Sequence, residues 1–348
     1  MSVFRPPVAP SKTPATPQSV WYARCPTLTA MGLVANRGVF QREFLRENVY
    51  IVSVRENSTP SVRQGHLDHS LPNLIREADA ATALWAHGLN GQSRLLAVGQ
   101  TWHAVTVVTR PSQGLNSLRD LAGRRLSLPK EAGNFSPAQV RSLRAWETIL
   151  AVAGVPAQDV EFAPVVADHP SVPFGDVARR EVEALLSGQT DVAILFGAKG
   201  IELARSAHLK VVKRFSAEDI RTDARLGGLV ELRALTVDAT LLEFSRDIVT
   251  RVTGNLVQAG DWAHDFPREA LKQAALEGKV EIADAETAYG ALLADGAGLG
   301  LEPERLGALD SLQTWLKGHH LLPGAHRIAD WLEPDVLTAA QARIHEVA

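Results

Sequence analysis

Apolar and polar residues alternate in short blocks along the first two thirds of the chain, and these blocks predict strands and helices in turn. Short apolar runs rich in β-branched and aromatic residues predict strands at residues 19–24, 49–54, 93–110, 160–166, 192–197 and 209–215. Apolar residues at helical spacing predict helices at residues 28–47, 78–89, 136–155 and 176–191. This order is typical of α/β lobes built on parallel sheets that are flanked by helices.

The pattern changes near residue 238. From there on, helical spacing is found at residues 238–265, 267–277, 283–294, 302–320 and 333–347. One earlier helix carries its own boundary signals, because Ser136 is a good N-cap, Pro137 suits the first helical position and Gly154 suits the end. Residues 55–77 are rich in loop-forming residues, and we expect a loop there.

Length and composition fit a large globular protein. A chain of 348 residues is too long for one simple core, so two lobes are expected. Hydrophobic residues make up 45% of the chain and charged residues 22%, which allows a large buried core. The net charge of −3 and the pI of about 6.4 argue against nucleic acid as a partner, because that needs a basic face.

The N-terminal stretch and the cysteine count bear on location. Residues 1–18 contain several prolines and no apolar core of a signal peptide, so we expect a disordered, Pro-rich lead-in rather than a secretory signal. No apolar run approaches 18 residues, so we expect no membrane contact. The single cysteine, Cys25, fits a reducing compartment. Together these features predict a cytoplasmic protein.

Two short motifs carry a resemblance to a known fold. Their residues are Leu121, Gly123, Arg124 and Arg125, and then Leu185, Gly188 and Asp191. This pattern resembles the second lobe of type II periplasmic-binding proteins of the sulfonate, taurine and nitrate branch. The resemblance implies a bilobal α/β fold around a cleft, with an all-helical C-terminal part. We expect the first lobe at 19–108, the second at 109–231 and a return to the first at 232–348.

A second resemblance concerns the first lobe. Tyr22, Cys25 and Pro26 are followed by His66, Pro72 and Arg76, in the spacing His-x5-Pro-x3-Arg. This constellation is similar to the hydroxybiphenyl sulfinate desulfinase family, which uses the same fold without being a transporter component. The "DLAGRR" of residues 120–125 and the "DWAHD" of residues 261–265 also resemble that family. The resemblance runs from about residue 20 to residue 335 and implies that Cys25, His66 and Arg76 are catalytic.

Each of the three residues has a chemical reason to serve there. Cys25 precedes a predicted helix whose dipole favours a thiolate, although a lone cysteine can also be an inert core residue or a redox sensor. His66 can exchange a proton near neutral pH and poise a thiol, and His69 is a rival for this role. Arg76 offers a planar fork of donors to a two-oxygen anion, with Arg24 as a second candidate cation.

One departure from the family bears on the substrate. The family carries a Gly-Gly pair just after the arginine, which supplies backbone N–H groups to the substrate's oxyanion. Here Glu77, Ala78 and Asp79 follow Arg76. A carboxylate beside an anionic substrate would repel it. We therefore expect either that Asp79 turns away while the loop backbone donates, or that the ligand differs.

Further substrate-binding candidates are weaker, and each has a structural alternative. Trp146 resembles an aromatic residue that lines the family's cleft, but core packing explains it equally well. The N-terminus of a helix at Asn134, Phe135 and Ser136 can meet an anion, or Ser136 can simply be a cap. The remaining candidates are Tyr22, Pro26, Phe196 and Gly197.

The expected activity is hydrolytic cleavage of the carbon–sulfur bond of an organic, aromatic sulfinate, with release of sulfite. Cys25 would act either as a thiolate nucleophile or as a proton donor to the ring carbon. We expect no metal and no organic cofactor, because positioning and charge stabilisation suffice. The alternative is a non-catalytic solute-binding protein for a sulfonate-like or carboxylate anion. In either case the partner is a small anionic molecule, and the protein is a monomer or weak dimer.

Overall fold

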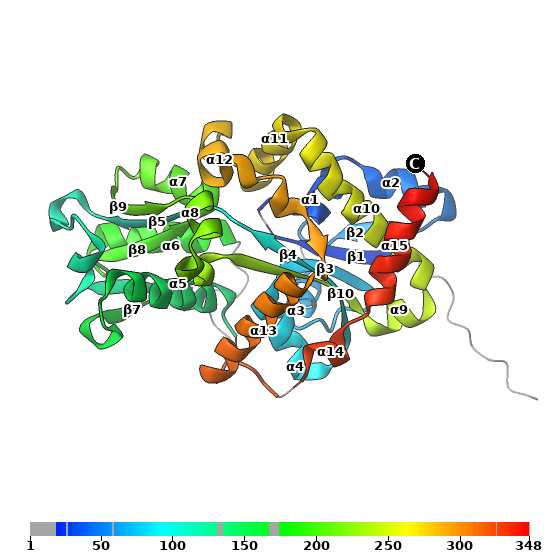
Figure 1. Ribbon diagram of the computed structural model, residues 1–348, viewed down its shortest axis with the longest axis horizontal. Helices are drawn as coiled ribbons and strands as arrows, with labels where there is room; N and C mark the ends of the chain where they lie inside the picture. Colours follow the sequence, from blue (N-terminus) through cyan, green and yellow to red (C-terminus); the bar gives the residue numbers. More distant parts are fainter. Residues whose placement is uncertain are drawn as a thin grey trace, which may run out of the picture.

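The computed structural model describes residues 19–25, 27–57, 59–130, 135–166, 174–324 and 326–347, and the predicted lead-in at 1–18 lies outside them. The described chain forms two sheets, each with its own helices, which lie side by side as two lobes (Figure 1). The chain passes between the sheets twice, once between Thr101 and Val105 and once between Phe215 and Glu231. The lobe boundaries at 108/109 and 231/232 stay predictions.

The first sheet has six strands in the order β11-β4-β10-β3-β1-β2. Their bounds are β1 Ser19–Arg24, β2 Tyr50–Ser53, β3 Leu74–Asp79, β4 Ser93–Thr101, β10 Glu231–Asp238 and β11 Leu299–Gly300. Strand β1 runs parallel to β2 and β3, whereas β10 runs antiparallel to β3 and β4. Strand β10 is antiparallel because it brings the chain back from the second lobe, while β4 leads out to it.

The second sheet has five strands in the order β7-β6-β8-β5-β9. Their bounds are β5 Val105–Thr109, β6 Arg125–Lys130, β7 Glu161–Val166, β8 Val192–Phe196 and β9 Lys210–Phe215. Strand β6 is parallel to β7 and β8, but β5 is antiparallel to β8 and β9. The expectation of parallel sheets is therefore wrong in part: both sheets are mixed.

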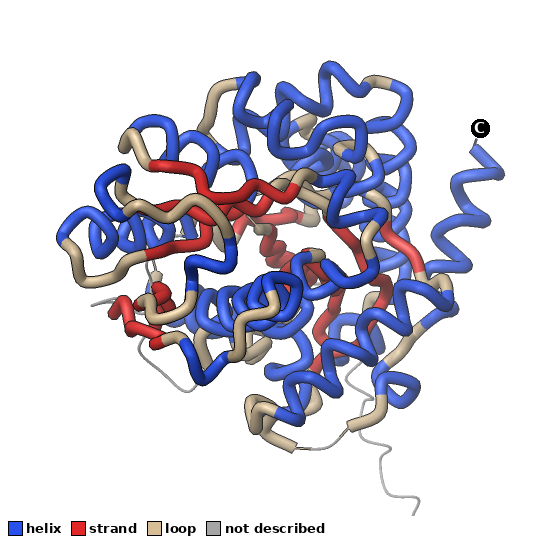
Figure 2. The backbone as a smooth tube through the Cα atoms, turned by 60° about the vertical axis from the view of Figure 1, so that its left-hand side comes forward, coloured by secondary structure: helices blue, strands red, loops and turns tan. Residues whose placement is uncertain are grey.

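Helices cover both faces of the first sheet (Figures 1 and 2). One face packs against the helices α1 Ala30–Asn36, α10 Arg246–Asp265, α11 Pro267–Gly278 and α12 Ile282–Tyr289. The other face packs against α4 Ala80–Asn90, α13 Pro303–Gly318 and α14 Ile328–Trp331. The C-terminal helix α15 Pro334–Val347 lies against α10, and α9 Ala239–Phe244 follows β10.

The second sheet is covered in the same way. One face carries α5 Pro137–Ala153 and α8 Ala217–Thr222, and the other carries α6 Phe174–Ser187 and α7 Gly197–Ser206. Short 3-10 turns complete the described chain at Leu45–Glu47, Pro111–Gln113, Leu118–Leu121, Ala157–Asp159, Ala224–Leu229, Gly290–Leu292 and Asp295–Ala297. No helix among the described residues is long and apolar enough to span a bilayer.

Most predicted elements are confirmed, and the errors have physical causes. The helix expected at 28–47 is broken into α1 and α2 Val39–Phe44, because Gly38 takes a left-handed conformation with φ 66°. The loop expected at 55–77 instead contains α3 Pro60–Leu67 and the start of β3. Ser136 caps α5 as predicted, accepting a hydrogen bond from Gln139 N at 3.2 Å.

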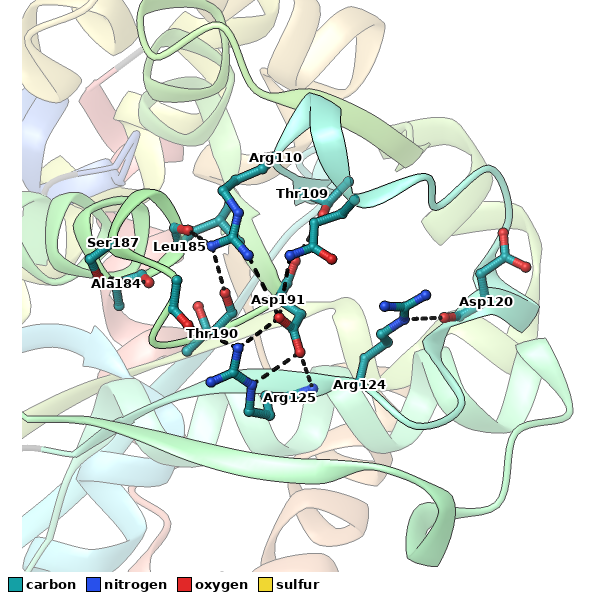
Figure 3. A network of polar contacts seen from close by, with 12 residues as sticks. Thr109, Arg110, Asp120, Arg124, Arg125, Ala184, Leu185, Ser187, Thr190 and Asp191 are labelled. Atoms are coloured by element: carbon teal, nitrogen blue, oxygen red, sulfur yellow. Dashed lines mark hydrogen bonds and ion pairs between the residues drawn. The ribbon is translucent and has the colours of Figure 1, made fainter.

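The two motifs that resemble the second lobe of binding proteins hold each other in place (Figure 3). Arg125 on β6 donates from Nη2 to Asp191 Oδ1 at 2.9 Å and from Nε to Oδ2 at 3.1 Å. The same Nη2 donates to Gly188 O at 2.8 Å, in a turn where glycine takes φ 83°. Arg110 reaches the carbonyls of Leu185 and Thr190. We call Arg110, Arg125 and Asp191 the lobe-2 network; it fixes β6 beside β8 and explains the motif structurally.

Candidate functional site at the lobe junction

Three strands of the first sheet bring their charged ends to one edge, which faces the second lobe. In the parallel pair β1–β3, Arg24 lies opposite Glu77, so Cys25, which directly follows β1, lies beside the last residues of β3. In the antiparallel pair β3–β10, Arg233 lies opposite Asp79, and Glu231 begins β10. The register of the sheet therefore brings together residues that are far apart in the chain.

Arg76 is the best-defined anion-binding candidate at this edge. Its side chain is buried, with 1% exposed. Nη1 donates to His66 O at 2.6 Å and to Leu67 O at 2.8 Å, the last carbonyls of α3, where a cation is favourable. Nε and Nη2 have no hydrogen-bond partner among the described residues. Burial lowers the pKa of Arg76 to about 10, and nearby Cys25 opposes this shift. Two donors of a buried cation thus stay open to a ligand.

Cys25 is held as a thiol rather than a thiolate. Burial raises its pKa to about 12, and Glu231, Asp79 and Glu77 add to the rise, while Arg233 opposes it. The predicted stabilisation of the Cys25 thiolate by a helix dipole is not found. Helix α1 begins only at Ala30, and Met31 N donates at 2.7 Å to Glu77 Oε2, which neutralises this helix end. The expectation of a dipole-stabilised thiolate is therefore wrong.

The two histidines of the loop differ in their surroundings. His66 is half-buried in the last turn of α3, and its carbonyl is tied to Arg76. Its action on Cys25 stays a prediction. His69 is fully buried, with Nε2 3.1 Å from Thr236 Oγ1. Burial, and then the charge of Arg76, hold the pKa of His69 well below its usual value. His69 is thus a neutral packing residue behind Arg76.

The carboxylates that replace the family's glycine pair are occupied by other groups. Glu77 accepts from Arg233 Nε at 3.0 Å, and neither side chain is exposed. Asp79 accepts from Thr82 N at 2.9 Å and so caps α4. Burial raises the pKa of Asp79. Because this segment is strand β3 rather than a loop, its backbone is paired with β1 and β10. The expectation that these residues lie in a loop is wrong.

A small cavity lies between the lobes beside these carboxylates. Its volume is about 30 Å³, and its charged and aromatic lining residues are Asp79, His103, Arg141, Arg144, Phe196 and Glu231. Arg141 on α5 lies over the ring of Phe196, 3.9 Å from its centroid, and 3.9 Å from Glu231. Both lobes contribute to its wall, so a ligand held there would be gripped from two sides.

His103 and Glu231 form a buried pair in this wall. Nδ1 of His103 lies 3.4 Å from Oε2 of Glu231, and the two side chains are 1% and 7% exposed. Neither ring nitrogen of His103, nor Glu231 Oε2, makes a hydrogen bond within the described part of the chain. Burial lowers the pKa of His103 to about 4, and Glu231 opposes this shift. His103 is therefore neutral at pH 7.

Sequence reasoning missed Glu231 and its neighbour Arg233, although a signal for both existed. Glu231 and Arg233 stand two residues apart within an apolar segment that the structure shows as the buried strand β10. Charges at this spacing share one face of a strand, and a buried charge requires a partner. Recognising 231–238 as a strand would have singled out both residues.

Among the weaker candidates, the structure separates those at the cavity from those in the core. Phe196 lines the cavity, and Gly197 follows it with φ 59°, facing the ring of His103. Phe135 stacks on Trp85 with ring centroids 5.1 Å apart. Ser136 is the cap described above. Pro26 and Asn134 lie outside the described residues.

Cys25, His66 and Arg76 are not among the residues that line this cavity. Three further candidates are also placed away from it. Trp146 is fully buried in the core of the second lobe and donates from Nε1 to Ser127 O at 2.8 Å, so the packing alternative applies. Tyr22 is buried against Phe40 in the first-lobe core. Arg24 binds Glu277 at 3.0 Å and is no second cation for the ligand. Within the described ranges, no group of three or more metal-binding side chains is arranged to hold an ion.

Comparisons with known proteins agree with the predicted fold. No family model and no curated protein matches this chain. A cysteine-to-serine mutant of DszB in complex with biphenyl-2-sulfinic acid has a TM-score of 0.76 at 21% identity, over 93% of this chain and 99% of that one. The desulfurization enzyme DszB itself gives 0.73 and 21%, over 94% and 99%.

A sulphonate-binding protein shares the fold as well. The periplasmic aliphatic sulphonate-binding protein SsuA from Escherichia coli has a TM-score of 0.63 at 11% identity, over 91% of this chain and 93% of that one. The predicted bilobal, periplasmic-binding-protein-like fold is thus confirmed, together with its likeness to both groups. At such identities the likeness establishes the fold and leaves the chemistry to the site.

Proposed function

We propose that the protein binds a small organic sulfur oxyanion at the lobe junction and hydrolyses the carbon–sulfur bond of an aromatic sulfinate. The observation that carries this proposal is Arg76, a buried guanidinium with two unpaired donor atoms, on which the Cys25 side chain acts electrostatically. A planar fork of two N–H donors matches the two oxygens of a sulfinate. The complex of DszB with biphenyl-2-sulfinic acid, which shares the fold, supports this choice of ligand.

The protonation state of Cys25 favours one of the two routes. Since the thiol keeps its proton at neutral pH, Cys25 protonates the ring carbon as the carbon–sulfur bond breaks. The products are the arene, sulfur dioxide and the Cys25 thiolate. Water then adds to sulfur dioxide to give bisulfite and a proton, and the thiolate regains a proton. The sum is sulfinate plus water to arene plus bisulfite, and Arg76 holds the oxygens throughout.

Binding requires the lobes to separate. A cavity of about 30 Å³ holds one or two water molecules, whereas an aryl sulfinate is several times larger. The two connections between the sheets, at 102–104 and 216–230, are where such an opening would bend. Closure then excludes water from the ligand and strengthens the electrostatic interactions that hold the anion.

Sulfite release from biphenyl-2-sulfinate and benzenesulfinate tests the activity. We expect the wild-type protein to release sulfite, and Cys25→Ser to lose at least 1,000-fold in rate because a serine hydroxyl is a much weaker acid. Ser311→Ala, an exposed change on α13, is the control and should stay active. A fully active Cys25→Ser protein would overturn the mechanism. Cell fractionation tests the cytoplasmic location that we propose with it.

A second function, binding without catalysis, is favoured by one specific observation. Cys25 is not activated as a nucleophile, because its pKa is raised, and the sulphonate-binding protein SsuA has the same fold. On this hypothesis, calorimetry detects binding of an alkyl sulfonate or a sulfinate to wild-type protein, and no sulfite appears. Arg76 would grip the anion in both cases.

A further inference from the structure

The pair His103–Glu231 is built in a way that simple packing does not require. Both side chains are more than nine-tenths buried, yet three of their polar atoms lack hydrogen bonds among the described residues. Leaving a buried polar atom unpaired costs about 1–3 kcal/mol. Both residues line the interlobe cavity, so the unpaired atoms belong to the wall of a possible binding site. Unpaired buried polar atoms of this kind are typical of functional sites.

The pair is also connected to Cys25. Thr27, two residues after Cys25, donates from Oγ1 to Glu231 Oε1 at 3.5 Å. The carboxylate of Glu231 is the charged group that acts most strongly on the Cys25 thiol. On its other side, Glu231 faces Arg141 of the second lobe at 3.9 Å. One carboxylate thus touches the cysteine loop, the imidazole and the opposite lobe.

Other charged groups surround the His103–Glu231 pair and influence the protonation of both residues. Strand β3 contributes Asp79, α5 contributes Arg141 and Arg144, and β10 contributes Arg233, which is paired with Glu77. From α12, Tyr289 meets the edge of the His103 ring, with centroids 6.4 Å apart. The imidazole therefore lies between a carboxylate and an aromatic ring. A carboxylate beside an imidazole stabilises the imidazolium form when a proton arrives.

We propose that His103 and Glu231 form a proton-return pair, which takes a proton at the sulfur-hydration step and gives it back to Cys25. The inference rests on the proposed desulfinase function. After Cys25 protonates the ring carbon, its sulfur is a thiolate and sulfur dioxide remains. When water adds to sulfur dioxide, the water proton goes to the neutral imidazole of His103, and Glu231 balances the new charge. The proton then passes to the thiolate, which restores both groups with no external oxidant or reductant.

Alkylation of the lone cysteine gives a test that does not need turnover. The pH dependence of iodoacetamide labelling, followed by intact mass, reports only Cys25. We expect Glu231→Gln to lower the midpoint by at least one pH unit, because it removes a negative charge beside the thiol. Glu286→Gln, an exposed change on α12, should leave it unchanged. An unchanged midpoint in Glu231→Gln would overturn the coupling.

Turnover then tests the proton-return role. We expect His103→Gln to lower kcat at least 10-fold with less than a threefold change in KM, and imidazole to restore part of the activity of His103→Ala. Equal kcat in His103→Gln and wild type would overturn the role while the proposed function stands. If wild-type protein releases no sulfite, the proposed function itself fails, and the role fails with it. Circular dichroism of each variant identifies a loss of fold.

Discussion

Two groups of arginines and carboxylates in this protein differ in how fully they are paired. In the lobe-2 network, Arg125 lies on the surface with 40% of its side chain exposed, and it meets Asp191 through two parallel hydrogen bonds. At the lobe junction, Arg233 and Glu77 are fully buried, and Arg76 has two open donors. We call Arg76, Glu77, His103, Glu231 and Arg233 the junction group.

This difference distinguishes arginines that stabilise the fold from arginines that are candidates for binding a ligand. A paired arginine at the surface gives local order at little cost in desolvation. A buried, partly unpaired arginine has a large desolvation free energy, which is offset only when an anion binds to it. The motif that identifies the fold is therefore the fully paired network, while the candidate chemistry lies in the incompletely paired group.

The largest expected effect comes from breaking the buried pair of the junction group. Glu77→Ala leaves the charge of Arg233 unpaired and removes the acceptor of Met31 N. We expect the free energy of unfolding to fall by about 3–5 kcal/mol. Asp191→Ala in the lobe-2 network should cost only about 1 kcal/mol, because water can solvate Arg125. Urea unfolding measures both, and equal losses would contradict the distinction.

The next effect separates binding from stability. In the Cys25→Ser background, we expect Arg76→Gln to weaken the binding of biphenyl-2-sulfinate about 100-fold, because two charge-assisted hydrogen bonds are lost. Arg76→Lys should weaken it nearly as much, since an ammonium cannot form the fork. Calorimetry measures both, with Arg125→Gln as the control. If Arg125→Gln weakened binding equally, the ligand would not be at the junction.

The sequence predicted local features well and long-range pairings poorly. Helix α5 was predicted with its cap because Ser136, Pro137 and Gly154 act within the helix itself. Cys25 and Arg76 were proposed as site residues from short motifs, and their roles stay predictions. Glu231 and His103 were missed, because their meeting depends on the return of β10 from the second lobe. The hydrogen bond between Arg233 and Glu77 spans 156 residues, a distance over which local periodicity carries no information.

Trp146 shows the limit of the resemblance in another way. An aromatic residue inside an amphipathic helix fits a cleft and a core equally well, because spacing does not tell which face is covered. The indole N–H found its partner in Ser127 O on the neighbouring strand. Similarly, the segment 55–77 looked like a loop, because its helix α3 is short and weakly apolar. Arg76 stabilises the end of that helix through tertiary contacts.

Another buried carboxylate, in the second lobe, extends the comparison. Glu181 on α6 is buried and accepts a hydrogen bond from Ser127 Oγ at 2.8 Å. Burial raises its pKa from 4.5 to about 8, and Ser127 and Arg141 only partly oppose the rise. A buried carboxylate without a close arginine thus takes up a proton, whereas Glu77, which has one, forms an ion pair.

The pH dependence of stability follows from this difference. Because the folded protein binds the Glu181 proton more tightly than the unfolded chain, its contribution is complete below about pH 4.5 and is lost as the pH rises to about 8. Glu181→Gln keeps an acceptor for Ser127 and cannot ionise. We expect the variant to match wild type near pH 4.5 and to be more stable by roughly 1–3 kcal/mol at pH 8.5. Glu183→Gln, exposed on the same helix, should follow wild type at both pH values. Thermal unfolding across this pH range measures the difference in stability. If stability depended on pH in the same way in wild type and Glu181→Gln, Glu181 would be ionised in the folded protein, and burial would not explain the difference between Glu181 and Glu77.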